Sequence, residues 1–287
     1  MRLAEKIKRV GFLQTIDDIT GNSFSYLKYL WCKQTRRVYF GSFLAATQGK
    51  SVRHYYMQEV VKEYCKNHNE SLMILELGSW AGGSAITWAD AIKRYCVKQG
   101  RVLCIDPWVD YIEPSKNKEW THKTMKKSFK NDSIYKLFFY NIFASKNSDI
   151  VSAIRGSADE ILPLLKEGSF DLIFIDANHA YEFVYNDIKN FSPLLKNGGI
   201  LCGDDLELQY NEVDRGNITL MKDQDVIVDP LTKKRYHPGV SLAVYRFFTG
   251  DVSVWNGFWA MRKIGEHWEK ISLKISEKEI IIPAHLR

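Results

Sequence analysis

Five short apolar runs, each followed closely by glycine or aspartate, constrain the fold more than any other feature of the sequence. The runs lie at 73–77, 102–105, 150–154, 172–175 and 200–201. Each is apolar throughout rather than alternating with polar residues, as is typical of strands covered on both faces. They alternate with helical patterns at 84–95, 121–143, 158–166 and 181–195. Strands that alternate with helices predict an α/β fold with a doubly wound, mostly parallel sheet.

The segments around this region predict additions to the sheet. Residues 1–66 are mostly helical in pattern, so we expect an N-terminal helical extension that caps the substrate site or an oligomer interface. The catalytic domain is expected over residues 67–287. Within it, residues 207–237 are polar and irregular, and their length favours an active-site insertion over a plain connection.

The C-terminal part predicts one more helix and two more strands. Pro238 occupies a position that proline tolerates at the start of a helix, which then runs over 239–248. Apolar and aromatic residues at 252–261 and 268–275 predict a C-terminal antiparallel hairpin with Gly265 in its turn. With these two strands, the predicted sheet has seven.

The composition is that of a soluble globular protein with reduced thiols. The 287 residues are 45% hydrophobic and 26% charged. No apolar run reaches the roughly 18 residues needed to span a membrane, and the N-terminus lacks the continuous apolar segment of a secretory signal. Five cysteines without a C-x-x-C spacing favour reduced thiols. These features predict a cytoplasmic location and no transmembrane segment.

The net charge of +6 permits an anionic partner without requiring one. Positive charge is concentrated in residues 6–37, where aromatic residues interleave with basic ones, and in residues 116–136. Each stretch is either a solvated helix face or a contact for an anionic substrate or a membrane surface. A nucleic acid is the less favoured partner, and a homo-oligomer is left open.

The first predicted strand leads into the glycine-rich sequence ELGSWAGGS at Glu76–Ser84. Gly78 and Gly82 allow a sharp turn and a close approach of a ligand to the backbone, and Ser84 can cap the following helix. A dinucleotide site would have G-x-G-x-x-G, so that pyrophosphate meets the helix N-terminus. Here the carboxylate of Glu76 repels pyrophosphate and suits an ammonium group instead. A structural turn without a ligand is the alternative.

Acidic and aromatic residues follow the second predicted strand. Asp106 ends this strand, where a carboxylate can accept hydrogen bonds from both ribose hydroxyls of a nucleoside. Pro107 and Trp108 come next, and Trp108 either flanks an adenine or packs in the core. Ser157 and Ala158, after the third strand, are where the adenine edge would lie. The pattern predicts a nucleoside-containing cofactor.

Taken in order, these motifs resemble the class I S-adenosylmethionine-dependent methyltransferases, whose fold is a Rossmann-like α/β domain. The resemblance covers about half the chain, roughly residues 70–206, and is carried by residues 76–84, 105–106, 170–176, 176–181, 194–200 and 203–205. The last three segments look like the small-molecule O-methyltransferase branch. That branch includes catechol-type enzymes and bacterial macrolide-sugar enzymes.

The resemblance implies S-adenosylmethionine as the cofactor, with its methionine part beside the glycine-rich turn. Glu76 would lie near the amino group, and Asp106 would hold the ribose. The residues implied to line the cofactor are Glu76, Gly78, Ser79, Trp80, Gly82, Ser84, Asp106, Pro107, Trp108, Ser157, Ala158 and Asp176.

The resemblance also implies Mg²⁺. The metal-dependent branch uses an aspartate after the fourth strand and an acidic or amide pair after the fifth, which here match Asp176, Asp204 and Asp205. The branch's catalytic lysine matches His179. The sugar-modifying members carry a base at the position of Asn178, and an amide cannot take a proton at neutral pH. The sequence therefore departs from those members here.

Methyl transfer to a hydroxyl needs a base or a metal that lowers the pKa of the acceptor. Three carboxylates from two strand ends suit Mg²⁺, and a histidine titrates near neutrality. We therefore predict His179 and Asp176 as catalytic residues. In the alternative, Asp204 and Asp205 cap the next segment or pair with basic side chains, and His179 has no chemical role. His237 lines the acceptor pocket or lies in a plain loop.

Three functions remain as hypotheses. The leading one is an O-methyltransferase of bacterial type for a small or carrier-linked acceptor, with a sugar or glycan among the candidates. The second is an RNA or protein methyltransferase, which only the basic N-terminal stretch supports. The third is a non-catalytic, nucleoside-binding interaction protein. A nicotinamide oxidoreductase is disfavoured by Glu76 and by the spacing of the glycines.

Overall fold

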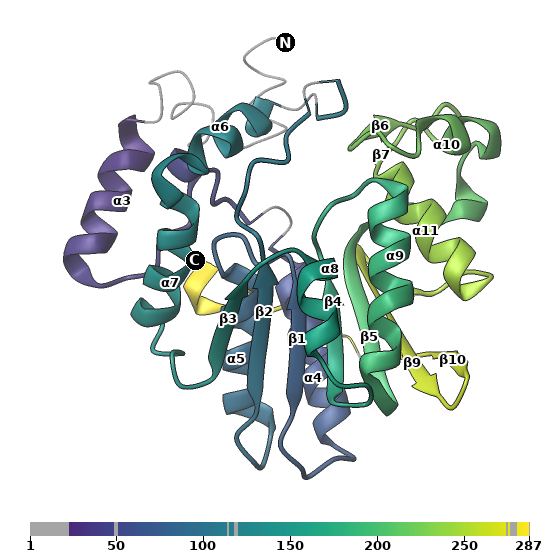
Figure 1. Ribbon diagram of the computed structural model, residues 1–287, viewed down its shortest axis with the longest axis horizontal. Coiled ribbons are helices and arrows are strands. Elements are labelled where there is room, and N and C mark those ends of the chain that lie inside the picture. The colour runs from purple at the N-terminus through teal and green to yellow at the C-terminus, as the bar shows by residue number, and fades with distance from the viewer. Residues whose placement is uncertain are drawn as a thin grey trace.

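Helices cover both faces of one twisted sheet in the computed structural model (Figure 1). The structure describes residues 23–48, 51–113, 115–117, 120–273, 275 and 280–286. The order of the main strands is β10-β9-β5-β4-β1-β2-β3, and the short β8 pairs with β9. The strands are β1 (Met73–Leu77), β2 (Arg101–Asp106), β3 (Val151–Arg155), β4 (Phe170–Ile175), β5 (Leu195–Leu206), β8 (Ser253–Trp255), β9 (Gly257–Ile264) and β10 (His267–Lys270).

The first five strands are parallel, and β9 is antiparallel to β5. The α/β prediction is therefore confirmed. Strand order reverses between β1 and β4, and ligands of doubly wound sheets bind outside the carboxyl ends of the strands at such a reversal. Leu77 at the end of β1 pairs with Ile105 of β2 and Ile175 of β4. The residues that follow these three strands consequently share one edge.

Alternate strand residues supply two hydrophobic cores. Leu172 and Phe174 face the core on the side of α4 and α5, whereas Ile173 and Ile175 face the core on the side of α9 and α11. The helices are α3 (Ser23–Thr35), α4 (Arg53–Cys65), α5 (Gly83–Tyr95), α6 (Trp120–Ser128), α7 (Ser133–Ala144), α8 (Ala158–Ile161), α9 (Tyr181–Phe191), α10 (Arg215–Met221) and α11 (Pro238–Phe248). None of the helices in the described ranges could span a membrane.

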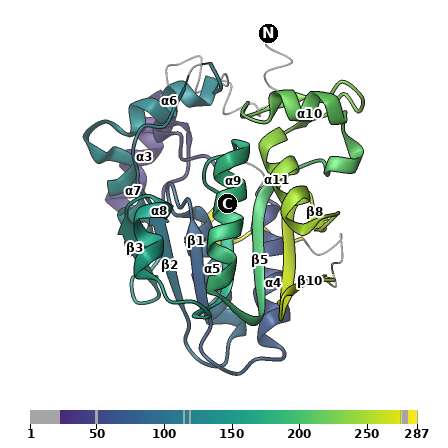
Figure 2. The same cartoon turned by 45° about the vertical axis from the view of Figure 1, so that its right-hand side comes forward.

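The segment predicted as an insertion forms its own small structure next to the carboxyl edge of the sheet. It contains α10 and a two-stranded sheet of β6 (Ile227–Val228) and β7 (Arg235–Tyr236). Figure 2 shows α10 above the upper end of α11. This part of the chain therefore lies on the side of the molecule where the strand ends place the candidate site.

Two predicted elements are broken by residues with positive φ. The expected strand at 252–261 is two strands, because Asn256 and Gly257 have φ of 53° and 98° and form a tight turn. Asn-Gly is a strong hairpin signal, and it gives the sheet eight strands rather than seven. The expected helix at 121–143 is likewise interrupted, because Asn131 and Asp132 have φ of 55°. The last predicted strand is only β10.

Two other helices are shorter than predicted. Those expected at 158–166 and 181–195 end as α8 and α9 and continue as 3-10 turns at Leu162–Leu164 and Ser192–Leu194, each with a proline in its first turn. Proline lacks the N–H group that the α-helix needs. Further 3-10 turns lie at Ser42–Leu44, Lys130–Asp132, Tyr210–Glu212 and Ala284–Leu286.

The expectation of five reduced cysteines is wrong for two of them. Cys65, at the end of α4, forms a disulfide with Cys96, the residue after α5, and their Cα atoms are 5.5 Å apart. The packing of α4 against α5 brings these ends together across 31 residues of sequence, a proximity that spacing alone does not reveal. The other cysteines, Cys32, Cys104 and Cys202, are free and buried.

Candidate active site

The glycine-rich turn brings the end of β1 against the end of β4. Gly78 has a φ of +85°, and a Cβ at this position would overlap the carbonyl oxygen of Asp176. The backbone N–H of Asp176 donates to Leu77 at 2.9 Å, and that of Gly78 donates to Ile105 at 3.0 Å. Only glycine fits such a close approach with a left-handed φ. The cofactor motif and the first predicted catalytic aspartate are therefore neighbours.

Glu76 offers a buried carboxylate oxygen to a ligand. Its side chain is fully buried, and the Ser84 hydroxyl donates to its Oε1 at 3.0 Å. Its Oε2 has no hydrogen-bond partner among the described residues. Burial raises the pKa of Glu76 to about 8, against the opposing effect of the Ser84 hydrogen bond. A buried, unpaired acceptor fits the ammonium group of an amino-acid-like cofactor.

The predicted helix-capping role of Ser84 is wrong. Helix α5 begins at Gly83, and Gly82 is its N-cap with a φ of 85° and no side-chain cap. Because the Ser84 hydroxyl lies one residue inside the helix, it reaches back to Glu76 instead. Its place in the glycine-rich turn is thus to orient the carboxylate.

Asp106 fixes the glycine-rich turn through backbone hydrogen bonds. Its Oδ2 accepts from the N–H groups of Ser79 at 3.0 Å and Trp80 at 2.9 Å, and its Oδ1 accepts from that of Trp108 at 2.7 Å. Burial raises the pKa of Asp106, and the three N–H groups act in the opposite direction. Both oxygens of this carboxylate thus accept backbone hydrogen bonds, and its ribose-binding role stays a prediction.

The aromatic residues of this region pack among themselves. Trp108 is buried, donates from Nε1 to the Trp80 carbonyl at 2.8 Å, and lies against Tyr135 and Phe138 of α7. The indole of Trp80 donates to the Ala45 carbonyl at 2.8 Å. The sequence left open whether Trp108 flanks an adenine or packs in the core, and its environment in the structure is that of a core residue.

The remaining predicted cofactor residues lie after β2 and β3. The Ser157 hydroxyl accepts from the backbone N–H of Glu160 and completes a capping box for α8, whose first residue is Ala158. The Pro107 carbonyl accepts from Arg155 Nε at 3.3 Å. Their proximity to an adenine stays a prediction.

Arg53 joins two of the predicted metal ligands. It is the first residue of α4, and its Nη1 donates to Asp176 Oδ2 at 2.9 Å and to Asp204 Oδ2 at 2.5 Å. All three side chains are mostly buried. Burial acts to lower the pKa of Arg53, but the two aspartates outweigh it, so the guanidinium stays charged. Burial raises the pKa of Asp176 to about 7 despite Arg53.

His179 lies between two carboxylates. Its Nε2 is 3.0 Å from Asp205 Oδ2, and its Nδ1 is 2.7 Å from Oδ1 of Asp225, which belongs to the insertion. Burial acts to lower the pKa of His179, but Asp205 and Asp225 outweigh it and raise that pKa well above its usual value. The imidazole is thereby made a stronger base and held in one orientation.

Further titratable residues extend this cluster. His237 Nδ1 is 3.0 Å from Glu207 Oε2 and 3.8 Å from Asp205 Oδ1, so His237 belongs to the cluster rather than to a plain loop. His122 of α6 lies with its Nε2 3.1 Å from Asp225 Oδ2. A cavity of about 10 Å³ beside Asp176 and Asp204 leaves room for about one water. The side chains thus nearly fill the space around this cluster.

The residues as they stand do not fit the implied Mg²⁺. Asp176 and Asp204 share the guanidinium of Arg53, and Asp205 pairs with His179 and His237. Mg²⁺ prefers an octahedral set of oxygens and retained waters. Groups of three potential ligand atoms within 4.8 Å do occur in the described residues, but each includes a histidine. Asp176, Asp204 and Asp205 as a Mg²⁺ site stay a prediction.

Sequence reasoning missed Arg53 and Asp225. Arg53 is separated from Asp204 by 151 residues, and Asp225 from His179 by 46. Neither belongs to a motif, and no local pattern marks either residue. The one general signal was the prediction that 207–237 is an active-site insertion, since Asp225 lies within it.

Three comparisons relate the chain to known proteins. A family model described as a methyltransferase domain matches residues 75–206. The chain is similar to the O-methyltransferase TomG from Streptomyces achromogenes, which has 18% identity and a TM-score of 0.46, over 77% of this chain and 82% of that chain. It is also similar to an O-methyltransferase from Bacillus cereus, with 20% identity and a TM-score of 0.46, over 77% and 84%. No curated protein matches the sequence.

The family match includes all of the strand ends that form the site. It extends from β1 to β5, and so contains the glycine-rich turn, Asp106 and the aspartates after β4 and in β5. The buried Glu76 in front of the turn fits an ammonium group rather than a pyrophosphate. Residues 75–206 therefore match the methyltransferase-domain family over the part of the chain that forms the site.

Proposed function

We propose that this protein transfers the methyl group of S-adenosylmethionine to a hydroxyl oxygen of a small or carrier-linked acceptor, with a sugar or glycan among the candidates. The observation that carries the proposal is the position of His179, between two carboxylates and at the same sheet edge as the cofactor turn. A hydroxyl is a weak nucleophile, and a base placed at such an edge can activate it.

His179 is the base in this proposal. When bound, S-adenosylmethionine would supply an electrophilic methyl group to the acceptor oxygen and would leave as a neutral thioether. Nε2 of His179 first gives up its contact with Asp205 and contacts the acceptor hydroxyl instead. The hydroxyl proton then passes to Nε2. The Nδ1–H of His179 continues to donate to Asp225, and this hydrogen bond fixes the tautomer of the imidazole. Asp205 and Asp225 stabilise the imidazolium that forms.

Arg53 supplies positive charge where the oxygen becomes negative. Its guanidinium lies between Asp176 and Asp204, so the acceptor side holds a fixed cation without a metal. Preorganised charge of this kind is often the largest contribution to catalysis. In this proposal Asp176 positions Arg53, and it lies beside the cofactor turn through its backbone contact with Gly78.

The test separates cofactor binding from turnover. S-adenosylhomocysteine affinity is measured by calorimetry, and methyl transfer by product release with a panel of sugars and catechols. His179→Ala and Asp176→Ala are expected to bind within about threefold of wild type and to lose about 10²–10⁴-fold in turnover. The control is His68→Ala, a remote histidine stacked on Tyr64. Full activity in both site variants would overturn the mechanism, and methylation of RNA alone would overturn the acceptor class.

A further inference from the structure

Helix α3 exposes large apolar side chains on one side and packs Ser25, Tyr29 and Cys32 against the protein on the other. Phe24, Leu27, Leu30 and Trp31 are 54%, 63%, 44% and 50% exposed, whereas Ser25 and Cys32 are buried. A helix that packs on a globular protein normally has the opposite arrangement. Its outward face therefore requires an explanation other than packing within the described residues.

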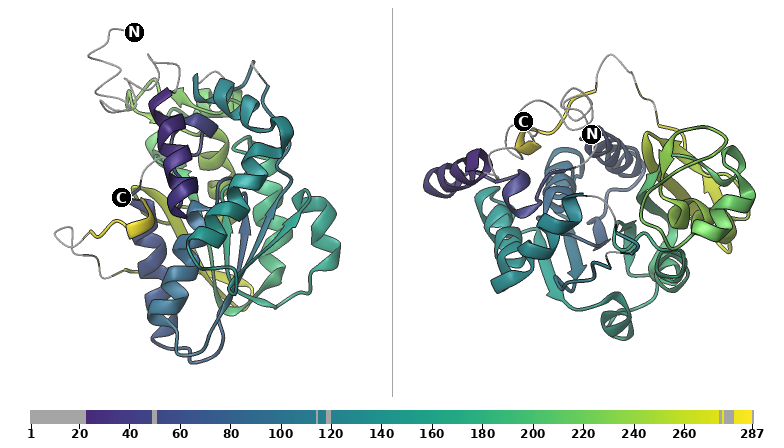
Figure 3. Two further views of the ribbon diagram at one scale, coloured as in Figure 1. Left: turned by 90° about the vertical axis from the view of Figure 1, so that its left-hand side faces the viewer. Right: turned by 90° about the horizontal axis from the view of Figure 1, so that it is seen from above.

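The orientation of α3 is fixed by specific contacts. The hydroxyls of Ser25 and Tyr39 are 2.5 Å apart, and the backbone N–H of Phe43 donates to Ser25 Oγ at 3.1 Å. On the same inner side, the hydroxyl of Tyr140 in α7 donates to the Cys32 carbonyl at 2.7 Å. Because these contacts hold the side of the helix with Ser25 and Cys32 inward, the face with Leu27 and Trp31 points away from the protein. Figure 3 shows α3 at the periphery of the molecule.

Basic residues lie in and directly after α3, and acidic ones are absent from this part of the sequence. Residues 23–48 contain Lys28, Lys33, Arg36 and Arg37 and no aspartate or glutamate. Arg37 lies over the ring of Trp31, with its guanidinium 4.8 Å from the ring centre. Apolar and aromatic side chains with a basic border are typical of helices that lie in the interface of an anionic membrane.

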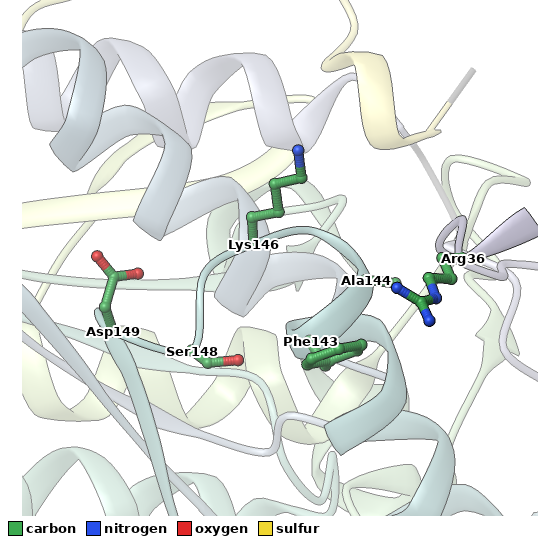
Figure 4. A pocket seen from close by; sticks show the side chains of 6 residues that line it. All are labelled: Arg36, Phe143, Ala144, Lys146, Ser148 and Asp149. Carbon is green, nitrogen blue, oxygen red and sulfur yellow. The ribbon is translucent and has the colours of Figure 1, made fainter.

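A hollow at the end of α3 extends this surface to α7. It has a volume of about 420 Å³ and is lined by Arg36, Phe143, Ala144, Lys146, Ser148 and Asp149 (Figure 4). Phe143 is exposed, and the basic groups of Arg36 and Lys146 flank the hollow from α3 and from the residues after α7. Asp149 is its one acidic residue and lies 4.0 Å from Lys93. A hollow of this kind suits an anionic headgroup beside an apolar chain.

We propose that α3 and the end of α7 form a docking surface for an anionic phospholipid bilayer. We define the surface by Phe24, Leu27, Leu30, Trp31, Arg36 and Phe143. A second copy of the chain would present the same cations, so pairing through this face would set like charges against each other. A nucleic acid could stack its bases on the aromatic side chains but would leave the exposed Leu27 and Leu30 without a partner. An anionic bilayer matches both the charge and the apolar stripe, independently of which acceptor the enzyme methylates.

The experiment measures sedimentation of the full chain with phosphatidylcholine vesicles, with and without phosphatidylglycerol. We expect binding only when phosphatidylglycerol is present, and weaker binding in high salt. The double variant Leu27→Gln/Trp31→Gln is expected to lower the partition coefficient at least about tenfold, and Arg36→Gln about fivefold. The control Leu164→Gln removes an exposed leucine outside the surface and is expected to bind as wild type.

Two further measurements keep the result interpretable. Unchanged binding of S-adenosylhomocysteine by the double variant shows that the fold is intact. Light scattering after size-exclusion chromatography gives the oligomeric state. The proposal is overturned by a lack of binding to phosphatidylglycerol vesicles, by equal binding of the double variant and wild type, by a dimer that this variant dissociates without vesicle binding, or by binding of RNA alone.

Discussion

The proposed cofactor side, around the glycine-rich turn, and the proposed acceptor side, around Arg53 and His179, share one edge of the sheet but are held by different interactions. On the cofactor side, glycines and backbone N–H groups around Asp106 fix the turn, and all of them lie within 76–108. On the acceptor side, Arg53, His179 and Asp225 come from segments far apart in the chain and are held by ion pairs. The cofactor side depends on backbone geometry, and the acceptor side depends on the protonation states of its carboxylates and histidines.

This difference leads to separable consequences. Backbone hydrogen bonds to a buried carboxylate persist over a wide pH range, whereas a cluster of carboxylates and histidines changes its charge near neutrality. Changes on the cofactor side should therefore act on binding and folding at every pH. Changes on the acceptor side should act on turnover and should depend on pH.

The largest combined effect on stability and cofactor binding is expected for Gly78→Ala. The added Cβ would overlap the Asp176 carbonyl, and φ at this position is +85°, so we expect a loss of about 2–4 kcal/mol of stability and at least about 100-fold weaker S-adenosylhomocysteine binding. Urea unfolding and calorimetry measure these effects. Gly168→Ala is the control, because Gly168 has a φ of +61° with no atom near its Cβ position. Equal effects of the two changes would show that conformation alone matters, not the close approach.

Arg53→Ala tests the acceptor side next. It leaves Asp176 and Asp204 buried without their cation, which is expected to cost about 3–5 kcal/mol. Loss of Arg53 raises the pKa of Asp176 further, so the deficit should be largest at alkaline pH and should shrink as Asp176 takes a proton on acidification. S-adenosylhomocysteine affinity should stay within about threefold.

Mg²⁺ decides between the guanidinium and the predicted metal site. We expect wild-type turnover to survive treatment with a chelator, and Arg53→Ala to gain stability from added Mg²⁺. Arg53→Lys keeps the charge but offers a single ammonium in place of the planar fork. Loss of wild-type turnover on chelation, restored by Mg²⁺, would favour the metal site formed by Asp176, Asp204 and Asp205.

Much of the fold and of the cofactor side was predictable because their signals are local. The apolar runs predict β1 to β5, and the glycine-rich turn contains Glu76, Gly78 and Gly82 within seven residues. The breaks at Asn131 and Asn256 were missed, although each depends on two consecutive residues with positive φ. Asn256 is followed by glycine and was a readable hairpin signal.

The acceptor side was only half predictable, because tertiary packing forms it. Asp176 and His179 follow β4, Asp204 lies near the end of β5, and all three could be found from the sequence. Their partners could not, since Arg53 reaches the site only through the packing of α4, and Asp225 only through the folding of the insertion. An ion pair between residues so far apart in the sequence produces no periodic pattern or fixed spacing from which it could be predicted.

A smaller effect is expected for Asp225→Asn. The amide removes one of the two charges that raise the pKa of His179. Only neutral His179 can accept the proton, so wild-type activity should rise through an alkaline-shifted limb of the pH–rate profile, and the variant's limb should move to lower pH. We also expect about tenfold lower turnover, because the imidazole loses its orienting carboxylate. An unmoved limb would exclude His179 as the titrating base.

The smallest effect is expected for Ser157→Ala, which removes a helix cap on the cofactor side. The hydroxyl accepts from the N–H of Glu160, so its loss should cost about 1 kcal/mol and change S-adenosylhomocysteine affinity less than about threefold. Asp214→Ala is the matched change on the acceptor side, because Asp214 caps α10 through the N–H of Asn217. Thermal unfolding and calorimetry compare the two variants. If Ser157→Ala alone weakens binding about tenfold or more, its hydroxyl contacts the adenine as the sequence predicts, and the cofactor side then depends on a side chain as well as on its backbone.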